Sequence, residues 1–77
     1  MNNITIYTLN WCPHCKELKE FLINNKIEFE NIDVEQDQDI AQDIMEKTGS
    51  EGFPITDIDG EYIIGLDIKK IKEILNI

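Results

Sequence analysis

Residues 4–22 form the sequence ITIYTLNWCPHCKELKEFL, which decides the fold of this chain. Its first five residues, Ile4–Thr8, alternate and are rich in β-branched and aromatic side chains, as is typical of a strand. Over Pro13–Asn24, apolar side chains recur at helical spacing, and proline suits the first turn of a helix. The two cysteines of the chain, Cys12 and Cys15, therefore lie at the junction of a strand and a helix.

The position and spacing of these cysteines predict a redox site. A thiol at the start of a helix faces unpaired backbone N–H groups and the positive end of the helix dipole, and both stabilise a thiolate. We expect Cys12 to attack a disulfide, and Cys15, which is more deeply placed and shielded, to release the mixed disulfide that forms. Two buried, inert cysteines are the simpler alternative, but a Cys-x-x-Cys pair beside a βαβ pattern is typical of redox chemistry.

The residues beside the cysteines are expected to tune this chemistry. When protonated, His14 would stabilise a nearby thiolate, so Pro13 and His14 should move the redox couple to a less negative potential. Alternatively, His14 is a solvated residue without an electrostatic role. We interpret Trp11 as a lip that contacts the substrate, with packing beside the site as the other possibility.

Cys12, His14 and Cys15 also carry atoms that bind zinc. Three ligands within four positions cannot readily close a tetrahedron, and the chain has no other Cys or His. We therefore expect no metal site and no bound cofactor.

The charge of the chain restricts its partners. Its 16 acidic residues and 7 basic residues, all lysines, give a net charge of -9. This field should repel nucleic acid and anionic membranes, and it provides solubility or attracts a basic partner. Because no segment is typical of a signal peptide or a membrane span, we expect the protein in the reducing cytoplasm, where a permanent disulfide is improbable. We also expect a monomer.

The rest of the sequence completes one predicted domain over residues 1–77. The expected elements are a strand over 27–34, a helix capped by Asp37 or Asp39 and ended by Gly49, a hairpin of strands over 55–58 and 61–64, and a last helix capped by Asp67. This order predicts an α/β fold, βαβαββα, with a mixed four-stranded sheet flanked by three helices.

Two segments of this predicted fold should face the cysteines. Pro54 is a candidate cis-proline that, with Phe53, presents backbone groups to an extended substrate. A trans proline at the start of an edge strand is the alternative. Near Gly65 a free backbone N–H could hold a carboxylate, and Asp67 either caps the last helix or accepts an ammonium group of a peptide-like thiol.

With these motifs the chain resembles the glutaredoxins, and more closely the short glutaredoxin-like redoxins of bacteria, over essentially its whole length. The resemblance depends on Tyr7-Thr8 followed by Cys12-Pro13-His14-Cys15, on Phe53-Pro54 and on Gly65-Leu66-Asp67. It implies a thioredoxin-like fold, a cis-proline before the third strand, and reduction of protein or glutathione-mixed disulfides with glutathione as co-substrate.

The resemblance also assigns roles to residues. It makes Cys12 the nucleophile and Cys15 the resolving thiol. It places the cysteinyl part of glutathione on the backbone of Phe53 and Pro54. The segment Gly65-Leu66-Asp67 completes the glutathione site, where Asp67 receives the γ-glutamyl amine.

Several residues differ from the usual family pattern. Leu9 replaces a lysine, Gly52-Phe53-Pro54 replaces Thr-Val-Pro, and Ile64-Gly65 replaces Gly-Gly. With Lys16 and Lys19 as the only basic residues near the site, the carboxylates of glutathione have few charged partners. Two alternatives follow: a redoxin that a flavoprotein of the thioredoxin-reductase type reduces and that serves ribonucleotide reductase or a peroxidase, or a non-enzymatic acidic interaction module.

Overall fold

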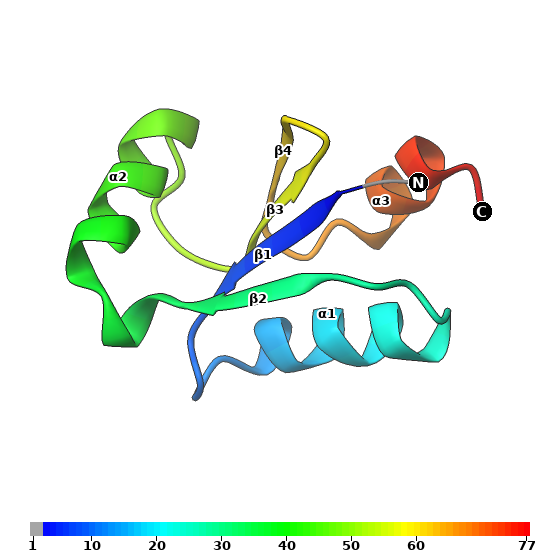
Figure 1. Cartoon of the computed structure of the whole chain (residues 1–77), viewed down its shortest axis with the longest axis horizontal. Coiled ribbons are helices and arrows are strands. Elements are labelled where there is room, and N and C mark those ends of the chain that lie inside the picture. The colour runs from blue at the N-terminus through cyan, green and yellow to red at the C-terminus, as the bar shows by residue number, and fades with distance from the viewer. Residues whose placement is uncertain (1–2) are drawn as a thin grey trace.

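Four strands form one mixed sheet in a computed structural model that describes residues 3–77. The elements are β1 (Ile4–Thr8), α1 (Pro13–Asn24), β2 (Glu30–Asp33), the short 3₁₀ helix η1 (Val34–Gln36), α2 (Gln38–Thr48), β3 (Ile55–Ile58), β4 (Glu61–Ile64) and α3 (Ile68–Leu75). The strand order is β2-β1-β3-β4, with β1 parallel to β2 and the other two pairings antiparallel. The predicted element order and mixed sheet are confirmed (Figure 1).

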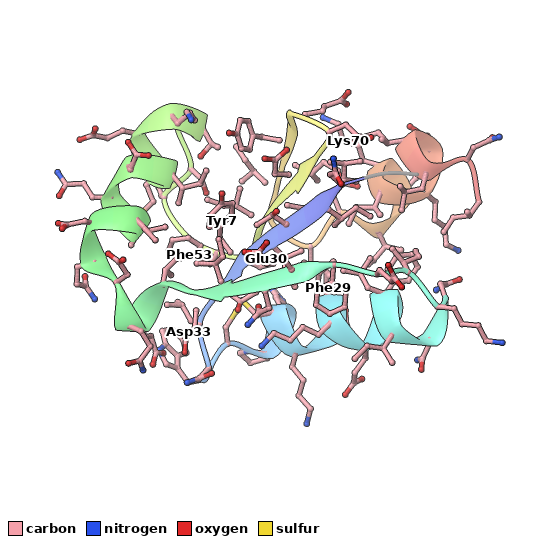
Figure 2. All side chains as sticks on the ribbon, in the orientation of Figure 1. Tyr7, Phe29, Glu30, Asp33, Phe53 and Lys70 are labelled. Carbon is pink, nitrogen blue, oxygen red and sulfur yellow. The ribbon has the colours of Figure 1, made fainter. Side chains whose placement is uncertain are left out.

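Successive side chains of β1 point to opposite faces of the sheet. Ile4, Ile6 and Thr8 are buried on one face, whereas Thr5 and Tyr7 are half-buried on the other. The first face packs against α1 and α3 in a core whose buried members are Ile4, Ile6, Leu18, Leu22, Ile58, Ile63 and Ile71. Each of these aliphatic side chains contributes about 1.5–3 kcal/mol through burial. On the other face Tyr7 points towards α2 (Figure 2).

The first helix begins and ends as predicted, but the second strand is shorter than expected. The strand predicted over 27–34 pairs with β1 only over Glu30–Asp33. At its start, Lys26 adopts a φ of 56° and the Ile27 N–H donates to the Leu22 carbonyl at 2.9 Å, so this segment still closes the end of α1. At its other end, Val34 belongs to η1, whose first turn is capped by Asp33.

Side-chain caps define the second helix. The Asp37 carboxylate accepts hydrogen bonds from the N–H groups of Asp39 and Ile40 at 3.1 and 3.2 Å, so Asp37 is the cap rather than Asp39. Gly49 ends the helix with a φ of 76°, which glycine adopts without steric cost. None of the helices within residues 3–77 is long and apolar enough to cross a membrane.

The hairpin between β3 and β4 is also confirmed. Asp59 and Gly60 both have positive φ, 51° and 92°, as a two-residue turn of this kind requires. The Asp57 carboxylate accepts the Gly60 N–H at 2.8 Å and further fixes the turn. The hairpin returns β4 towards the end of the sheet where β1 ends, which brings Gly65 to that end.

Candidate redox site

The two thiols lie where β1 ends and α1 begins. Cys12 is the N-cap of α1, and its Sγ accepts a hydrogen bond from the Cys15 N–H at 3.2 Å. The Cys12 N–H donates to the Leu9 carbonyl at 3.3 Å, which ties the connecting loop to the end of β1. A sulfur atom at this position faces the positive end of the helix dipole, and this suits a negative charge on it.

Both thiols are shielded from solvent. Cys12 is 8% exposed and Cys15 is 0% exposed. Cys12 is predicted to be the attacking thiol, yet its side chain turns towards the helix start and towards the loop that contains Phe53. Its thiol donates to the Phe53 carbonyl at 3.9 Å. The relative order is nevertheless as predicted, because Cys12 is the more accessible of the two.

The Cys15 thiol is strongly held in its protonated form. Burial raises the pKa of Cys15 from 9.0 to about 12, and the hydrogen bond with Cys12 contributes to the rise. The backbone of Leu9 and the charge of Lys19 act in the opposite direction. Near neutral pH Cys15 is therefore a thiol in the reduced protein.

The proline loop lies directly beside Cys12. The Phe53-Pro54 peptide bond is cis, as the sequence suggested, and the Pro54 carbonyl accepts the Gly65 N–H at 2.8 Å. This hydrogen bond holds the segment before α3 against the proline loop. Phe53 lies with Asp33 at the end of the sheet where β1 ends (Figure 2). The fold thus brings three predicted site segments to one end of the sheet.

The segment Gly65-Leu66-Asp67 leads into α3. Gly65 has a φ of 77°, and Leu66 is half-buried against the core. Asp67 is exposed, and its carboxylate accepts the Lys70 N–H at 3.1 Å as the N-cap of α3. The capping role of Asp67 is confirmed, whereas acceptance of an ammonium group stays a prediction.

Three predicted site residues are open to solvent beside Cys12. Trp11 is 73% exposed, and Pro13 and His14 are exposed as well. Trp11 is thus not packed into the structure beside the site. Its role as a substrate lip stays a prediction, as do the tuning roles of Pro13 and His14.

Sequence reasoning missed two features of this end of the molecule. Thr8 is only 1% exposed, and its hydroxyl donates to the Asn31 side-chain oxygen at 2.6 Å, linking β1 to β2 just before the redox loop. The signal was available, since Thr8 continues the buried row of Ile4 and Ile6. The second feature is Lys19, which is predicted only as a basic residue near the site and which is half-buried on α1.

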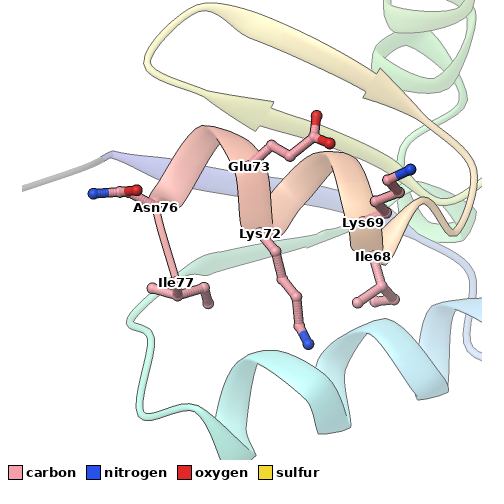
Figure 3. A pocket seen from close by; sticks show the side chains of 6 residues that line it. All are labelled: Ile68, Lys69, Lys72, Glu73, Asn76 and Ile77. Carbon is pink, nitrogen blue, oxygen red and sulfur yellow. The ribbon is translucent and has the colours of Figure 1, made fainter.

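Within residues 3–77 no three His, Cys, Asp or Glu side chains are placed to hold a metal ion. A depression of about 660 Å³ lies against α3, where Lys72 points towards α1 (Figure 3). It is lined by Ile68, Lys69, Lys72, Glu73, Asn76 and Ile77, none of which is a predicted site residue.

Comparison with known proteins gives a consistent result. The Glutaredoxin family model matches residues 4–63. A glutaredoxin-like 8.6 kDa protein of the rubredoxin operon of Clostridium pasteurianum is 31% identical over 94% of this chain and 96% of its own length. A variant of the thioredoxin-like protein BC3987 is 35% identical, with a TM-score of 0.89 over 100% of this chain and 99% of its own.

A further solved structure is that of NrdH-redoxin from Escherichia coli, a glutaredoxin-like protein with a thioredoxin-like activity profile. It is 27% identical, with a TM-score of 0.83, and the match covers 92% of both chains. The matched region of the family model includes both cysteines and the proline loop. The chain has a thioredoxin-like fold and belongs to the glutaredoxin family.

Proposed function

We propose that this protein is a dithiol oxidoreductase that reduces protein or glutathione-mixed disulfides. The observation that carries the proposal is the unequal placement of the two thiols. Cys12 occupies the N-cap of α1 with a backbone N–H directed at its sulfur, whereas Cys15 is fully buried behind it. Membership of the glutaredoxin family, which suggests disulfide oxidoreductase activity, supports the same chemistry.

The proposed reaction has two exchange steps. The Cys12 thiolate attacks one sulfur of the substrate disulfide, a Cys12–substrate disulfide forms, and the other substrate sulfur leaves as a thiolate. Cys15 then loses its proton and attacks the Cys12 sulfur, which breaks the mixed disulfide. The substrate has gained two electrons and takes up two protons, and the protein is left with a Cys12–Cys15 disulfide.

The surroundings of Cys12 give a proposed task to the proline loop, to Trp11 and to Asp67. The backbone of Phe53 and Pro54 pairs with the extended chain around the substrate cysteine. Trp11 forms a lip over that chain, and its 73% exposure leaves its ring free for such contact. The exposed carboxylate of Asp67 receives the amine of a γ-glutamyl group when the substrate carries glutathione.

Glutathione is the first candidate reductant of the Cys12–Cys15 disulfide. A flavoprotein of the thioredoxin-reductase type is the second, with ribonucleotide reductase or a peroxidase as the electron acceptor. The second route is favoured by the likeness to NrdH-redoxin, by Leu9 in the place of a lysine and by the absence of arginine. In either case we propose a cytoplasmic role, since that compartment keeps thiols reduced.

A Cys15→Ser variant tests the two-step scheme. It should accumulate a mixed disulfide through Cys12 and lose dithiol turnover, because no second thiol releases the substrate. Mass spectrometry of the trapped species and a protein-disulfide reduction assay measure both effects. Reduction of protein disulfides by this variant at the full rate would overturn the assigned roles.

The reductant is identified by a coupled assay. The disulfide form of the wild-type protein is offered glutathione with glutathione reductase, or NADPH with a thioredoxin-type flavoprotein, and NADPH consumption is followed in both. The faster route identifies the electron source. Failure of both routes would support the interaction module instead.

A further inference from the structure

Lys19 lies one helical turn beyond Cys15 on α1. Side chains separated by four positions are neighbours on a helix, with Cβ atoms about 5–6 Å apart. Around the helix axis, the side chain of Lys16 leaves the backbone about 100° from that of Cys15, whereas the side chain of Lys19 leaves it only about 40° away. The exposures agree with this geometry, since Lys16 is exposed and Lys19 is half-buried.

Lys19 is half-buried among side chains of α1 that face the core. Its neighbours at Cys15, Leu18 and Leu22 are all buried against the sheet. The apolar stem of a lysine can lie along such a surface while the ammonium group stays at the rim. In this arrangement the Lys19 charge can act on the Cys15 thiol, in agreement with its lowering of the pKa of Cys15.

We propose that Lys19 is a positioning residue that favours the thiolate of Cys15 in the step that releases the mixed disulfide. The proposal rests on the function proposed above, in which Cys15 performs that step. Lys19 donates no proton and forms no bond in it. The Cys15 proton goes to solvent, the Cys15 sulfur bonds to Cys12, and the departing substrate sulfur takes up a proton.

The second step needs such a group because Cys15 is fully buried. The groups that act on its thiol are Cys12 at the helix start, the backbone of Leu9 at the end of β1, and Lys19. Burial and Cys12 raise the pKa of Cys15, whereas Leu9 and Lys19 lower it. Lys19 supplies the one positive charge among these groups.

Formation of the mixed disulfide changes the balance between the groups that raise and those that lower the pKa of Cys15. Once the Cys12 sulfur is bonded to a substrate, it carries neither a proton nor a charge. Both of its effects that raise the pKa of Cys15, the thiol hydrogen bond and the charge repulsion, are then removed. The effects of Leu9 and Lys19 remain, so the resolving thiol becomes easier to ionise when its ionisation is required.

Single-turnover kinetics with dithiodipyridine, a neutral disulfide, separate the two steps. Attack by Cys12 releases one thiopyridone, and attack by Cys15 releases the second, so absorbance rises in two phases. In Lys19→Gln, which keeps much of the stem but loses the charge, the second phase should slow by about 3- to 10-fold, as for a pKa about half a unit to one unit higher. The first phase should be unchanged.

Two matched variants and a pH profile complete the test. Lys19→Arg keeps the charge and should restore the second phase, and Lys16→Gln removes a neighbouring exposed charge and should leave both phases unchanged. The profile of the second phase in Lys19→Gln should be displaced to higher pH, which loss of packing alone would not produce. Thermal unfolding checks that all three variants are folded.

Other outcomes distinguish failure of the role of Lys19 from failure of the proposed dithiol mechanism. A second phase of wild-type rate and wild-type pH profile in Lys19→Gln would overturn the role of Lys19, and so would equal slowing by Lys16→Gln. Absence of a second phase in the wild-type protein, or of any thiopyridone release, would instead overturn the dithiol mechanism itself.

Discussion

Cys15 combines two demands on a single residue. Its side chain fills a fully buried position in α1. In the proposed reaction its sulfur must nevertheless become a thiolate. Burial raises its pKa to about 12, so the folded protein holds the Cys15 proton more tightly than the unfolded chain does. A group of this kind links the stability of the reduced protein to pH.

The sign of this linkage can be measured. Below pH 9 the Cys15 thiol is protonated in the folded and unfolded states, so it adds no pH dependence. Above pH 9 only the unfolded chain ionises, and the free energy of unfolding should fall by about 1 kcal/mol for each pH unit up to about pH 12.

Denaturant unfolding of the reduced protein at a series of pH values above pH 9 measures this fall in the free energy of unfolding. Cys15→Ala provides the control, because it removes this titration and leaves those of the tyrosines and lysines in place. The wild-type curve should therefore decline more steeply than that of the variant. Parallel curves for the two proteins would contradict the tight retention of the Cys15 proton.

At the scale of the elements, α3 shows how one residue can serve structure and function together. The Asp67 carboxylate satisfies the Lys70 N–H at the start of the helix, and the same side chain is exposed beside the proline loop. The Gly65 N–H, bonded to the Pro54 carbonyl, fixes the position of this helix start. Capping and substrate contact at Asp67 can be separated by substitution.

Asp67→Ala should lower the free energy of unfolding by about 1 kcal/mol through loss of the cap. Asp67→Ser should stay close to the wild-type value, since a serine hydroxyl also accepts the helix N–H. Chemical denaturation compares the three proteins. If the KM for a glutathione-mixed disulfide rises equally in both variants, the carboxylate also receives an ammonium group. A serine variant as unstable as the alanine variant would show that α3 does not depend on this cap.

The boundaries of the elements show what a sequence can predict. Pro13, Gly49 and Asp67 mark helix ends by local chemistry, and each was predicted. The start of β2 depends instead on the Ile27 N–H, which bonds back to the Leu22 carbonyl and delays pairing with β1 until Glu30. No side chain signals that choice.

The candidate site divides in the same way. The spacing of Cys12 and Cys15 predicted the junction and the deeper position of the second thiol. The burial of Cys12 and the hydrogen bond between Gly65 and Pro54 depend on contacts between segments far apart in the chain. Local patterns therefore predicted which residues meet, but not how closely they pack.

For the molecule as a whole, the net charge of -9 includes an excess of carboxylates near the thiols. Asp33 pairs with Thr8 at the end of β1, and Glu51 lies two residues before Phe53. The carboxylates expected at this end are those of Asp33, Glu35, Glu51 and Asp67, while the nearby lysines are Lys16 and Lys19 of α1. The end of the molecule that carries the redox site therefore has an excess of negative charge.

Because of this excess, the rate at which the protein reacts with a small disulfide should depend on the charge of that disulfide. As salt is raised and the field is screened, the rate with cationic cystamine should fall and the rate with anionic glutathione disulfide should rise, each by roughly two- to threefold. The rate with neutral hydroxyethyl disulfide should stay constant. Stopped-flow measurement of the reduced protein against each disulfide gives these slopes.

Two charge variants localise the effect. Glu51→Gln should reduce the salt dependence for both charged disulfides. Glu61→Gln, which removes a charge from the opposite end of the sheet beside the start of β1, should leave it unchanged. Identical salt dependence for all three disulfides would show that the field does not reach the thiols.

The cap of α1 has one more consequence. In the reduced protein the Cys12 sulfur accepts the Cys15 N–H within the first turn of the helix, and it is also the atom that would exchange electrons in the proposed reaction. Most helix caps are chemically inert, whereas this sulfur changes its charge and its strength as an acceptor whenever a partner bonds to it. The first turn of α1 should therefore be held less firmly in the oxidised protein than in the reduced one.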